Sequence, residues 1–560
     1  MKITLAQQNY HIGNFENNTI KIIEAILQAK SENSDLIVFS EMSICGYPAR
    51  DFVEFSDFIE KCYESIEKIK EYTSDIAVLV GSPAKNPIID GKDLFNAAFF
   101  IYQKEIKAEI HKTLLPTYDV FDEYRYFEPA YDWNIVEFKG KKLAITICED
   151  IWNLGHNPLY RICPMDKLME QHPDVMINLS ASPFDYTHDE DRKTVIRNNV
   201  LKYKLPMFYC NAIGSQTEIV FDGASLIFDK HGNLCKALPM FQESICTVEL
   251  NNDGSINSNI LEPIDNLPKH LLNPTSLNEQ LNIAQIHDAL VLGIKDYFNK
   301  MGFKKAILGS SGGIDSAVTL ALACQALGSE NVRAILMPSE FSSDHSVNDA
   351  KQLSTNLLNP FDIISIEDIY KTFLNTLKPI FKDLPFSLAE ENIQSRSRGN
   401  LLMAIANKFG YILLNTSNKS ELATGYGTLY GDMAGGIGVL GDCYKLQVYE
   451  LAKYINRNTE IIPINIINKE PSAELRPNQK DSDSLPEYDI LDKILYQYIE
   501  LKQGPNEIKA MGFDEKMVDK ILKLVNTNEY KRNQFCPIIR ISPKAFGVGR
   551  RVPIVAKYLS

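Results

Sequence analysis

Ser311-Gly312-Gly313-Ile314-Asp315-Ser316 is the stretch from which the organisation of this 560-residue chain can be worked out. It follows the apolar run 306–308, typical of a buried strand, and Asp315 opens the helix-like stretch 316–322. Glycines let a backbone approach a ligand closely, and the free amides at a helix start attract an anion. The stretch therefore predicts a phosphate-binding loop between a strand and a helix.

Two common phosphate-binding motifs do not occur in this loop. It has no Gly-Lys-Ser/Thr, so no lysine of such a motif reaches a terminal phosphate, and no Gly-x-Gly-x-x-Gly dinucleotide fingerprint. A loop of hydroxyls and glycines suits a pyrophosphate that leaves intact. The alternative is an ordinary serine- and glycine-rich turn in which Asp315 only caps the helix, and it is the better interpretation of the six residues taken alone.

Alternating strand-like and helix-like patterns predict an α/β fold in the first half of the chain. The expected strands are Ile3–Gln7, Asp35–Glu41, Ile76–Ser82, Ala97–Tyr102, Lys142–Cys148, Val175–Ser180 and Met207–Gly214. The pattern stops at a polar, proline-containing stretch, so we expect a first domain at 1–265, a linker at 266–284 and a second domain at 285–560.

The second domain repeats the alternation with fewer strands. These are expected at Ala306–Ser311, Arg333–Ser339, Asp362–Ile366 and Tyr411–Ser417. Four parallel strands with a ligand loop after the first indicate a doubly wound sheet, which binds its ligand at the carboxyl ends of the strands.

Composition limits the functions that remain. The net charge of −14 argues against a nucleic-acid partner, and no apolar run approaches the ~18 residues of a membrane span. The ten cysteines form no Cys-x-x-Cys pair and the nine histidines show no metal-ligand spacing. We therefore expect a soluble, cytoplasmic protein without a disulfide framework.

Three residues in the first half have the right chemistry for amide hydrolysis: Glu41, Lys112 and Cys148. Each lies at the end of an apolar strand or beside a turn. Hydrolysis without a metal needs a nucleophile, a group that takes and returns its proton, and a positive charge or dipole for the oxyanion. Taken singly, a buried cysteine is more often a small core residue, and lone glutamates and lysines are usually solvated. The flanking residues have to distinguish these interpretations.

Those flanking residues resemble the nitrilase superfamily over residues 1–260. The motifs are, in order, Phe39-x-Glu41, Gly46-Tyr47-Pro48, Lys112-x-x-Leu115-Pro116-x-Tyr118, Arg125-Tyr126-Phe127, Cys148-Glu149-Asp150-x-Trp152 and Asn178-Leu179-Ser180-Ala181-Ser182-Pro183. The resemblance implies a nitrilase-like α/β sandwich. It further implies that Cys148 is the nucleophile, Glu41 the general base and Lys112 the charge that stabilises the tetrahedral intermediate.

The same resemblance implies a glutamine site that includes Tyr118 and Ser182. His188 is a third candidate for this site and departs from the family pattern, because relatives usually have Lys or Arg six residues after the serine. Glu123 and Glu149 are further carboxylates that we expect near the site.

The motifs of the second half resemble the NAD synthetase family over residues 285–560. They are Met337-Pro338-Ser339, Glu391-Asn392-Ile393-Gln394-Ser395-Arg396-x-Arg398, Asn415-Thr416-Ser417-Asn418-Lys419-Ser420-Glu421, Tyr430-Gly431-Asp432-Met433, Pro471-Ser472-Ala473-Glu474-Leu475 and Glu529-Tyr530-Lys531-Arg532. Members of this family are ATP pyrophosphatases, which cleave ATP to AMP and pyrophosphate while adenylylating a substrate. With the nitrilase-like half in front, the whole chain resembles the glutamine-dependent NAD synthetases. The resemblance implies that deamido-NAD is amidated through an adenylylated intermediate with ammonia from L-glutamine, with glutamate, AMP and pyrophosphate as co-products.

The resemblance also implies where the ligands bind. ATP is expected at Gly309, Ser310, Ser311, Gly312, Gly313, Ile314, Asp315, Ser316, Met337 and Thr416, and deamido-NAD at Asn392, Glu421 and Lys531. Asp315 and Glu421 are oxygen donors of the kind that Mg²⁺ prefers, and the resemblance places them on the metal. Relatives assemble through their synthetase domains, which implies a homo-oligomer, a dimer or larger.

Two alternatives stay open at this stage. One is a related glutamine-dependent ATP pyrophosphatase that amidates another nucleotide; the run Asn415–Glu421 and Lys531 count against it. The other is a nucleotide sensor without catalytic activity, although a sensor need not retain a nucleophile together with its base.

Overall fold

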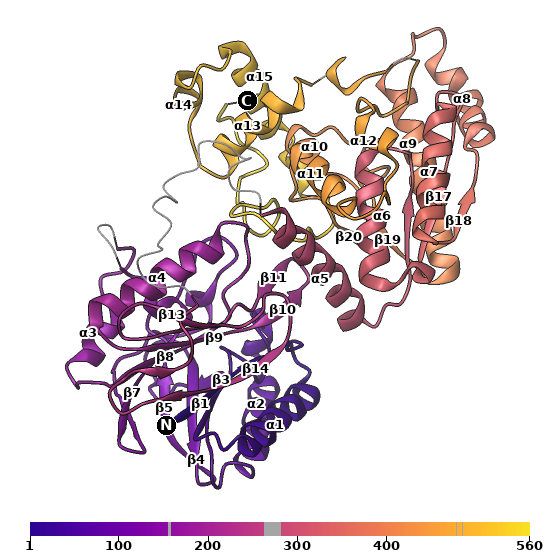
Figure 1. Cartoon of the computed structure of the whole chain (residues 1–560). Coiled ribbons are helices and arrows are strands. Elements are labelled where there is room, and N and C mark those ends of the chain that lie inside the picture. Colours follow the sequence, from indigo (N-terminus) through magenta and orange to yellow (C-terminus); the bar gives the residue numbers. More distant parts are fainter. Residues whose placement is uncertain (155–157, 262–281, 478, 484, 560) are drawn as a thin grey trace. The chain divides into compact units, whose positions relative to one another are not determined.

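The computed structural model describes residues 1–154, 158–261, 282–477, 479–483 and 485–559 of the chain. It divides into two compact units, Met1–Asn273 and Pro274–Ser560 (Figure 1). Most of the predicted linker at 266–284 lies outside the described residues.

Two mixed β-sheets form the centre of the N-terminal unit. The first has seven strands in the order β15-β14-β1-β2-β3-β4-β5, and the second has six in the order β13-β12-β9-β8-β7-β6. The first sheet consists of β1 Lys2–Gln7, β2 Leu36–Val38, β3 Ala77–Lys85, β4 Leu94–Tyr102, β5 Glu105–His111, β14 Ser244–Leu250 and β15 Ile256–Asn257. The second consists of β6 Val136–Phe138, β7 Lys141–Ile147, β8 Val175–Ser180, β9 Met207–Asn211, β12 Leu226–Phe228 and β13 Leu234–Ala237. A separate hairpin joins β10 Ile213–Gln216 to β11 Ile219–Asp222.

Alternating side chains explain how these sheets form layers, as β3 illustrates. Val78 and Val80 belong to the core that includes residues of α1 (Phe15–Ser31) and α2 (Ser56–Lys70), whereas Leu79 belongs to the core shared by the two sheets. On the second sheet, α3 (Pro164–Met169) and α4 (His188–Tyr203) cover the other face. The layers are therefore helix, sheet, sheet and helix, which confirms the predicted α/β sandwich.

Two predicted strands of this unit are longer than the observed ones. The strand expected at Asp35–Glu41 extends only over Leu36–Val38, and Glu41 lies in the turn that follows. The strand expected at Met207–Gly214 is interrupted at Ala212. Its first part pairs with β8 and β12, while its second part pairs with β11, because the chain leaves the sheet between them.

The C-terminal unit contains one parallel sheet of five strands in the order β18-β17-β16-β19-β20. The strands are β16 Ala306–Gly309, β17 Val332–Leu336, β18 Phe361–Ile363, β19 Ile412–Asn415 and β20 Ile437–Gly438. This order confirms the doubly wound sheet, and β20, only two residues long, is the strand that the sequence pattern did not predict.

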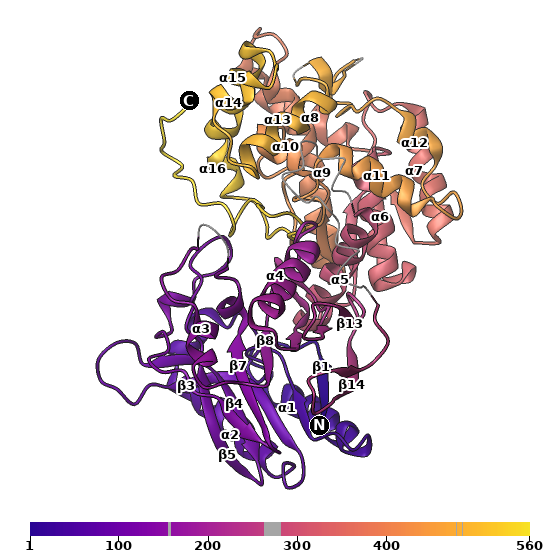
Figure 2. The same ribbon diagram turned by 60° about the vertical axis from the view of Figure 1, so that its left-hand side comes forward.

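Helices pack on both faces of this sheet, and Figure 2 labels most of them. They are α5 Ile283–Met301, α6 Ile314–Leu327, α7 Asp344–Leu357, α8 Glu367–Phe381, α9 Leu388–Phe409, α10 Lys419–Thr424, α11 Lys445–Ile455, α12 Ile464–Asn468, α13 Tyr488–Ile499, α14 Pro505–Ala510, α15 Glu515–Thr527 and α16 Glu529–Arg532. Ile307 of β16 packs with Leu402 and Ala406 of α9, while α5, α6 and α11 pack against one another on the opposite face. A second core joins α10, α13 and α15.

A buried ion pair connects α4 to the β10–β11 hairpin in the N-terminal unit. The guanidinium of Arg192 donates to both carboxylate oxygens of Asp222, at 3.0 and 2.9 Å, and neither side chain has exposed surface. Asn211 also donates to Asp222, and its side-chain oxygen accepts from the backbone amide of Ser182. The pair therefore supports the segment that contains Ser182.

We expect Asp222→Ala to lower the free energy of unfolding of the N-terminal unit by about 3–5 kcal/mol, because it removes the carboxylate that pairs with the buried Arg192 charge. Urea unfolding followed by tryptophan fluorescence measures this unit selectively, since both tryptophans, Trp133 and Trp152, belong to it. Asp57→Ala, which breaks an exposed ion pair with Lys61, is the control and should leave the transition unchanged. A wild-type transition in Asp222→Ala would contradict the prediction.

Candidate active sites

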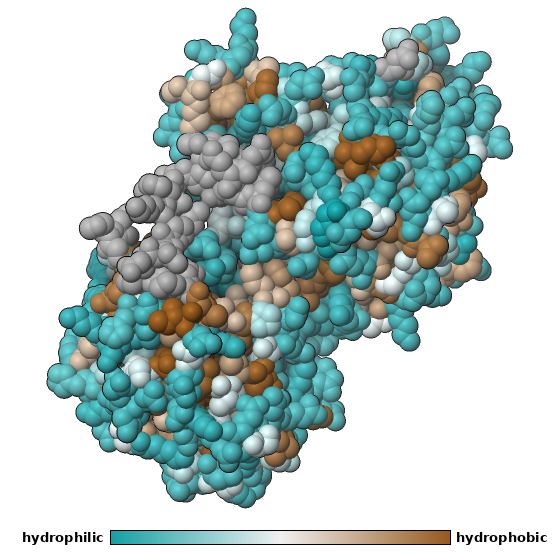
Figure 3. Space-filling model, in the orientation of Figure 1, coloured by the Kyte–Doolittle hydropathy of each residue, from teal (hydrophilic) through white to brown (hydrophobic). Residues whose placement is uncertain are grey.

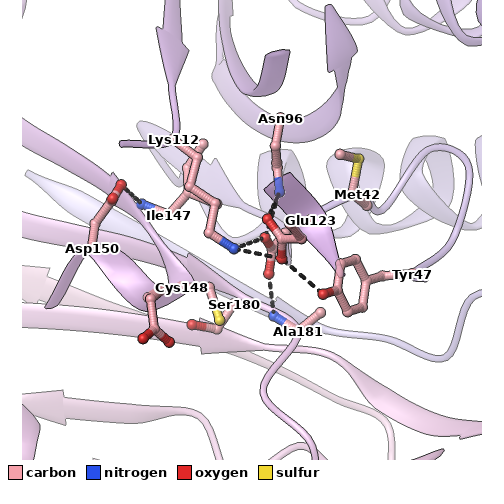
Figure 4. Close-up of polar contacts among 12 residues, drawn as sticks. Met42, Tyr47, Asn96, Lys112, Glu123, Ile147, Cys148, Asp150, Ser180 and Ala181 are labelled. Carbon is pink, nitrogen blue, oxygen red and sulfur yellow. Dashed lines mark hydrogen bonds and ion pairs between the residues drawn. The ribbon is translucent and has the colours of Figure 1, made fainter. Parts of the chain in front are cut away.

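Lys112 lies without exposed surface between two carboxylates in the N-terminal unit (Figure 4). Its ammonium is 2.7 Å from Glu41 Oε1 and 2.8 Å from Glu123 Oε1. Glu41 follows β2, Lys112 follows β5, and Glu123 begins a short 3₁₀ helix, so three distant segments meet at one point. The predicted base and the predicted oxyanion charge are therefore in direct contact.

Burial and ion pairing have opposite effects on the pKa of Lys112. Burial disfavours the charged form of Lys112, but the carboxylates of Glu123 and Glu41 outweigh it, and the pKa of Lys112 lies well above its usual range. Burial raises the pKa of Glu123, while the Lys112 ammonium lowers it. Lys112 therefore remains a fixed positive charge at any physiological pH.

Cys148 follows β7 directly and is almost fully buried. Its φ of 43° lies in the left-handed region, which costs energy for a residue with a Cβ and is common at functional sites. Burial and the Glu41 carboxylate raise the pKa of the thiol well above its usual value, against the lowering effect of Lys112. The resting thiol is therefore protonated, and it needs a base before it can attack an amide.

Asp150 connects the segments that contain Lys112 and Cys148. One of its carboxylate oxygens accepts from the backbone amides of Thr113 and Leu114, at 3.0 and 2.8 Å, and the other accepts from Ile147 at 3.1 Å (Figure 4). The residues directly after Lys112 are thus held against the residue directly before Cys148.

The three predicted glutamine-site residues contact two different groups. The Tyr118 hydroxyl donates to both oxygens of Glu149, each at 2.9 Å. Ser182 Oγ lies 2.8 Å from Nε2 of His188, whose ring stacks on Trp152 with 4.9 Å between the ring centroids. Burial raises the pKa of Glu149 to about 7, against the lowering effects of Lys112 and the Tyr118 hydroxyl. Tyr118 is thus held by the residue directly after Cys148, and His188 is held by Ser182 and Trp152.

Two further side chains contact the carboxylates of this site, and the sequence analysis assigned a role to neither. Asn96 donates to Glu41 at 2.7 Å and to Glu123 at 3.2 Å, and the Tyr47 hydroxyl donates to Glu123 at 2.7 Å. Tyr47 belongs to a quoted motif, but Asn96 lies in the middle of β4 and carries no local signal. Only the pairing of β4 with its neighbours brings Asn96 to the site.

A cavity of about 300 Å³ lies at the carboxyl ends of β16, β17 and β19 in the C-terminal unit. It is lined by most of the predicted ATP residues together with Glu421. These are Gly309, Ser310, Ser311, Gly313, Ile314, Asp315, Ser316, Met337, Thr416 and Glu421. The ligand position expected for a doubly wound sheet is therefore the position of this cavity.

Gly312 is the predicted ATP residue that does not line the cavity in the described chain. Its φ is 78°, and a Cβ there would approach the carbonyl oxygen of Ser346 to 2.3 Å, so only glycine fits. The side-chain oxygen of Ser310 is buried and has no hydrogen-bond partner among the described atoms.

Asp315 does not cap the helix, so that part of the alternative interpretation is wrong. The N-cap of α6 is Gly313, and Asp315 lies in the first turn. Its carboxylate instead accepts from Asn418 at 2.9 Å and lies 2.5 Å from the ammonium of Lys445, at the start of α11. The loop itself has no lysine, but α11 supplies one, and the position of Lys445 in the sequence gave no signal of this role.

The residues near Lys445 suit a magnesium ion. Glu421 Oε1 lies 3.7 Å from the Lys445 ammonium, so Glu421 and Asp315 share one cation. Burial and the neighbouring Asp315 carboxylate raise the pKa of Glu421. The described residues contain no group of three or more His, Cys, Asp or Glu that could hold a metal. However, Mg²⁺ needs only one or two protein carboxylates when phosphate oxygens and water complete its coordination.

Asn392 and Lys531 contact a different segment, the one that follows α10. Asn392 accepts from the Thr428 hydroxyl at 2.8 Å, and the Lys531 ammonium donates to the carbonyls of Gly425 and Gly427 at 2.7 and 2.8 Å. Neither is among the described residues that line the cavity. Glu421, on α10, is thus the only one of the three predicted deamido-NAD residues that lines it.

Together, the fold and the two sites define a carbon–nitrogen hydrolase joined to an ATP-dependent amidating unit. The family model described as Carbon-nitrogen hydrolase matches residues 2–255, and the one described as NAD synthase matches residues 286–535.

Individual relatives match over the whole chain. The glutamine-dependent NAD(+) synthetase of Synechocystis sp. is 43% identical over 563 residues, which cover 99% of each chain. That of Thermotoga maritima is 39% identical and covers 100% of this chain and 99% of its own. The solved structure of the glutamine-dependent NAD+ synthetase from Acinetobacter baumannii in complex with ADP has a TM-score of 0.77 at 38% identity, covering 99% of this chain and 98% of its own.

The chain belongs to the glutamine-dependent NAD(+) synthetase family, and it is an enzyme. This membership disfavours both alternatives, an enzyme that amidates another nucleotide and a sensor without activity. The residue roles proposed for the two sites stay predictions.

Glu41→Gln keeps the size and hydrogen bonding of the side chain but removes the base, so glutamine hydrolysis should fall by about 10²–10⁴-fold. Glutamate release from purified protein measures this step. NAD formation from ammonium chloride is the control and should remain, because Glu41 lies in the N-terminal unit. Near-normal glutamine hydrolysis would remove Glu41 from the proposed mechanism.

Proposed function

We propose that the protein makes NAD from deamido-NAD, ATP and L-glutamine, releasing AMP, pyrophosphate and glutamate. The observation that supports this most strongly is the presence in one chain of a buried Cys–Glu–Lys group and of a Ser/Gly-lined cavity at the end of a parallel sheet. The first suits release of ammonia from an amide, and the second suits activation of a carboxylate by ATP. The direct test is a chromatographic assay for NAD with all three substrates, omitting each in turn.

In the first half-reaction, Glu41 takes the thiol proton of Cys148 as the sulfur attacks the amide carbon of glutamine. The Lys112 charge stabilises the oxyanion that forms. Glu41 returns the proton to the departing ammonia, which leaves a thioester on Cys148. Water then hydrolyses the thioester to glutamate and restores the thiol. Tyr118, Ser182 and His188 orient the glutamine in this scheme.

In the second half-reaction, the nicotinate carboxylate attacks the α-phosphorus of ATP and pyrophosphate departs. This activation is needed because a free carboxylate would have to lose oxide when ammonia attacks, whereas the adenylate loses AMP. The loop Gly309–Ser316, Met337 and Thr416 bind ATP, and Lys445 adds a positive charge. Asp315 and Glu421 would hold Mg²⁺, which neutralises charge on the pyrophosphate.

Deamido-NAD is assigned to Asn392, Glu421 and Lys531. All three residues are associated with α10 or the segment after it. Asn392 and Lys531 contact that segment, and Glu421 belongs to α10 itself. The segment thus connects the proposed deamido-NAD residues to the cavity that we assign to ATP.

We also propose a cytoplasmic homo-oligomer that assembles through the C-terminal unit. The surface visible in Figure 3 is largely hydrophilic, with hydrophobic residues scattered over it. Ile380, Leu384 and Leu388, on and after α8, are 71%, 73% and 67% exposed, and self-association is one way to cover exposed apolar side chains. Among the described helices, none is long and apolar enough to span a membrane.

Cys148→Ala should abolish NAD formation with glutamine while ammonium chloride still supports it, because Cys148 supplies only the nitrogen. Parallel assays with the two nitrogen donors measure this. If the folded variant also lost its ammonia-dependent rate, the division of labour between the two units would be wrong.

Asp315→Asn should leave a folded protein that hydrolyses glutamine but makes almost no AMP, pyrophosphate or NAD from either nitrogen donor. The substitution keeps the size of the side chain and removes the negative charge facing Lys445 and Mg²⁺. Pyrophosphate release measures the effect, and glutamate release is the internal control. Full synthetase activity at ordinary magnesium concentrations would reduce Asp315 to a structural residue.

A further inference from the structure

A buried carboxylate accepts hydrogen bonds from residues next to those that we assign to Mg²⁺ and ATP. Asp492, on α13, has no exposed surface. Its Oδ1 accepts from the Ser420 hydroxyl at 2.5 Å, and its Oδ2 accepts from the backbone amide of Leu446 at 2.9 Å. The Ser420 oxygen in turn accepts from the backbone amide of Lys445 at 3.0 Å. One side chain therefore joins the starts of α10 and α11.

Those two helix starts present the charged side chains of the cavity. Helix α10 carries Glu421 and α11 carries Lys445, whose ammonium lies 3.7 Å from Glu421 and 2.5 Å from Asp315. With six residues, α10 is too short to keep its orientation without tertiary contacts. The distance between the Glu421 carboxylate and the Lys445 ammonium therefore depends on what holds the two helices together.

Helix α13 also contacts these charged residues through Tyr488, one helical turn before Asp492. The Tyr488 hydroxyl donates to Asp481 at 2.9 Å, and the Tyr488 ring centroid lies 5.3 Å from the Lys445 ammonium. Tyr488 and Asp492 are four residues apart and so share a helix face. Leu491 and Leu495 of the same helix belong to a hydrophobic core, so a carboxylate at 492 is a costly choice unless its hydrogen bonds are needed.

We propose that Asp492 is a positioning residue for the synthetase reaction. By tying α10 to α11 it sets the separation of Glu421 and Lys445, so that these two and Asp315 fit the Mg²⁺–triphosphate group of ATP. Asp492 itself is not among the described residues that line the cavity. The inference rests on the proposed function, because it takes the cavity to be the ATP site.

The test compares Asp492→Asn with Asp489→Asn, a matched substitution on the same helix whose side chain is exposed and pairs with Lys493. An amide in place of the carboxylate keeps the volume but cannot accept both hydrogen bonds. Calorimetric titration with α,β-methylene-ATP and Mg²⁺ should give an approximately tenfold higher Kd for Asp492→Asn. Asp489→Asn should bind as the wild type does, and both variants should melt within a few degrees of it. Wild-type affinity in a folded Asp492→Asn would overturn the inference.

Ser420→Ala provides a milder test of the same link if Asp492→Asn does not fold. It removes the hydroxyl between Asp492 and Lys445, and it should also weaken binding of the ATP analogue; wild-type affinity would overturn the inference. When both single variants fold, the double variant should bind no more weakly than Asp492→Asn alone, because both changes break one connection. Additive losses would contradict the link through Ser420. Failure of the wild type to make NAD would instead count against the proposed function, while the binding experiment would still test the role of Asp492.

Discussion

The contact of Lys112 with Glu41 and Glu123 is the interaction on which the N-terminal unit depends. All three side chains are removed from water, with exposures of 0%, 0% and 4%, so an imperfect arrangement would cost several kcal/mol for each charge. The contact forms only if the ends of β2 and β5 meet at one place. Asn96 from β4 and the backbone amide of Ala181 after β8 complete the hydrogen bonds, so both sheets must be aligned correctly.

The same contact explains why cysteine chemistry is possible in a buried place. Burial alone would keep the Cys148 thiol protonated and would leave an oxyanion without support. In the proposed mechanism, a fixed ammonium next to a carboxylate supplies both missing functions, because the carboxylate would accept the proton while the ammonium would stabilise the negative charge. The second carboxylate, Glu123, keeps Lys112 charged and in place.

The C-terminal unit uses a related but more open arrangement. Lys445 lies between Asp315 and Glu421, whose side chains are 18% and 17% exposed, so solvent and a nucleotide can reach them. The Lys445 ammonium partly neutralises the two carboxylates, which would otherwise repel a triphosphate. These three residues belong to α6, α10 and α11, so the distances between them depend on how the helices pack. Asp492 of α13 contributes to this packing through its hydrogen bonds with Ser420 and Leu446.

Much of this could be predicted from the sequence, because the decisive signals are contiguous. The Ser-Gly-Gly-Ile-Asp-Ser loop, the parallel strands and the Glu, Lys and Cys motifs are each short runs whose chemistry is local. Features that depend on distant partners were missed: the break between β9 and β10, the two-residue β20, and Lys445 as the partner of Asp315. Asn96, Lys445 and Asp492 have no local pattern, since each acquires its partners from segments far away in the chain. The sequence by itself thus determined the class of chemistry and the layer structure. Tertiary packing alone decided which charges face one another, because side chains interact over distances in space, and the fold sets these distances rather than separation along the chain.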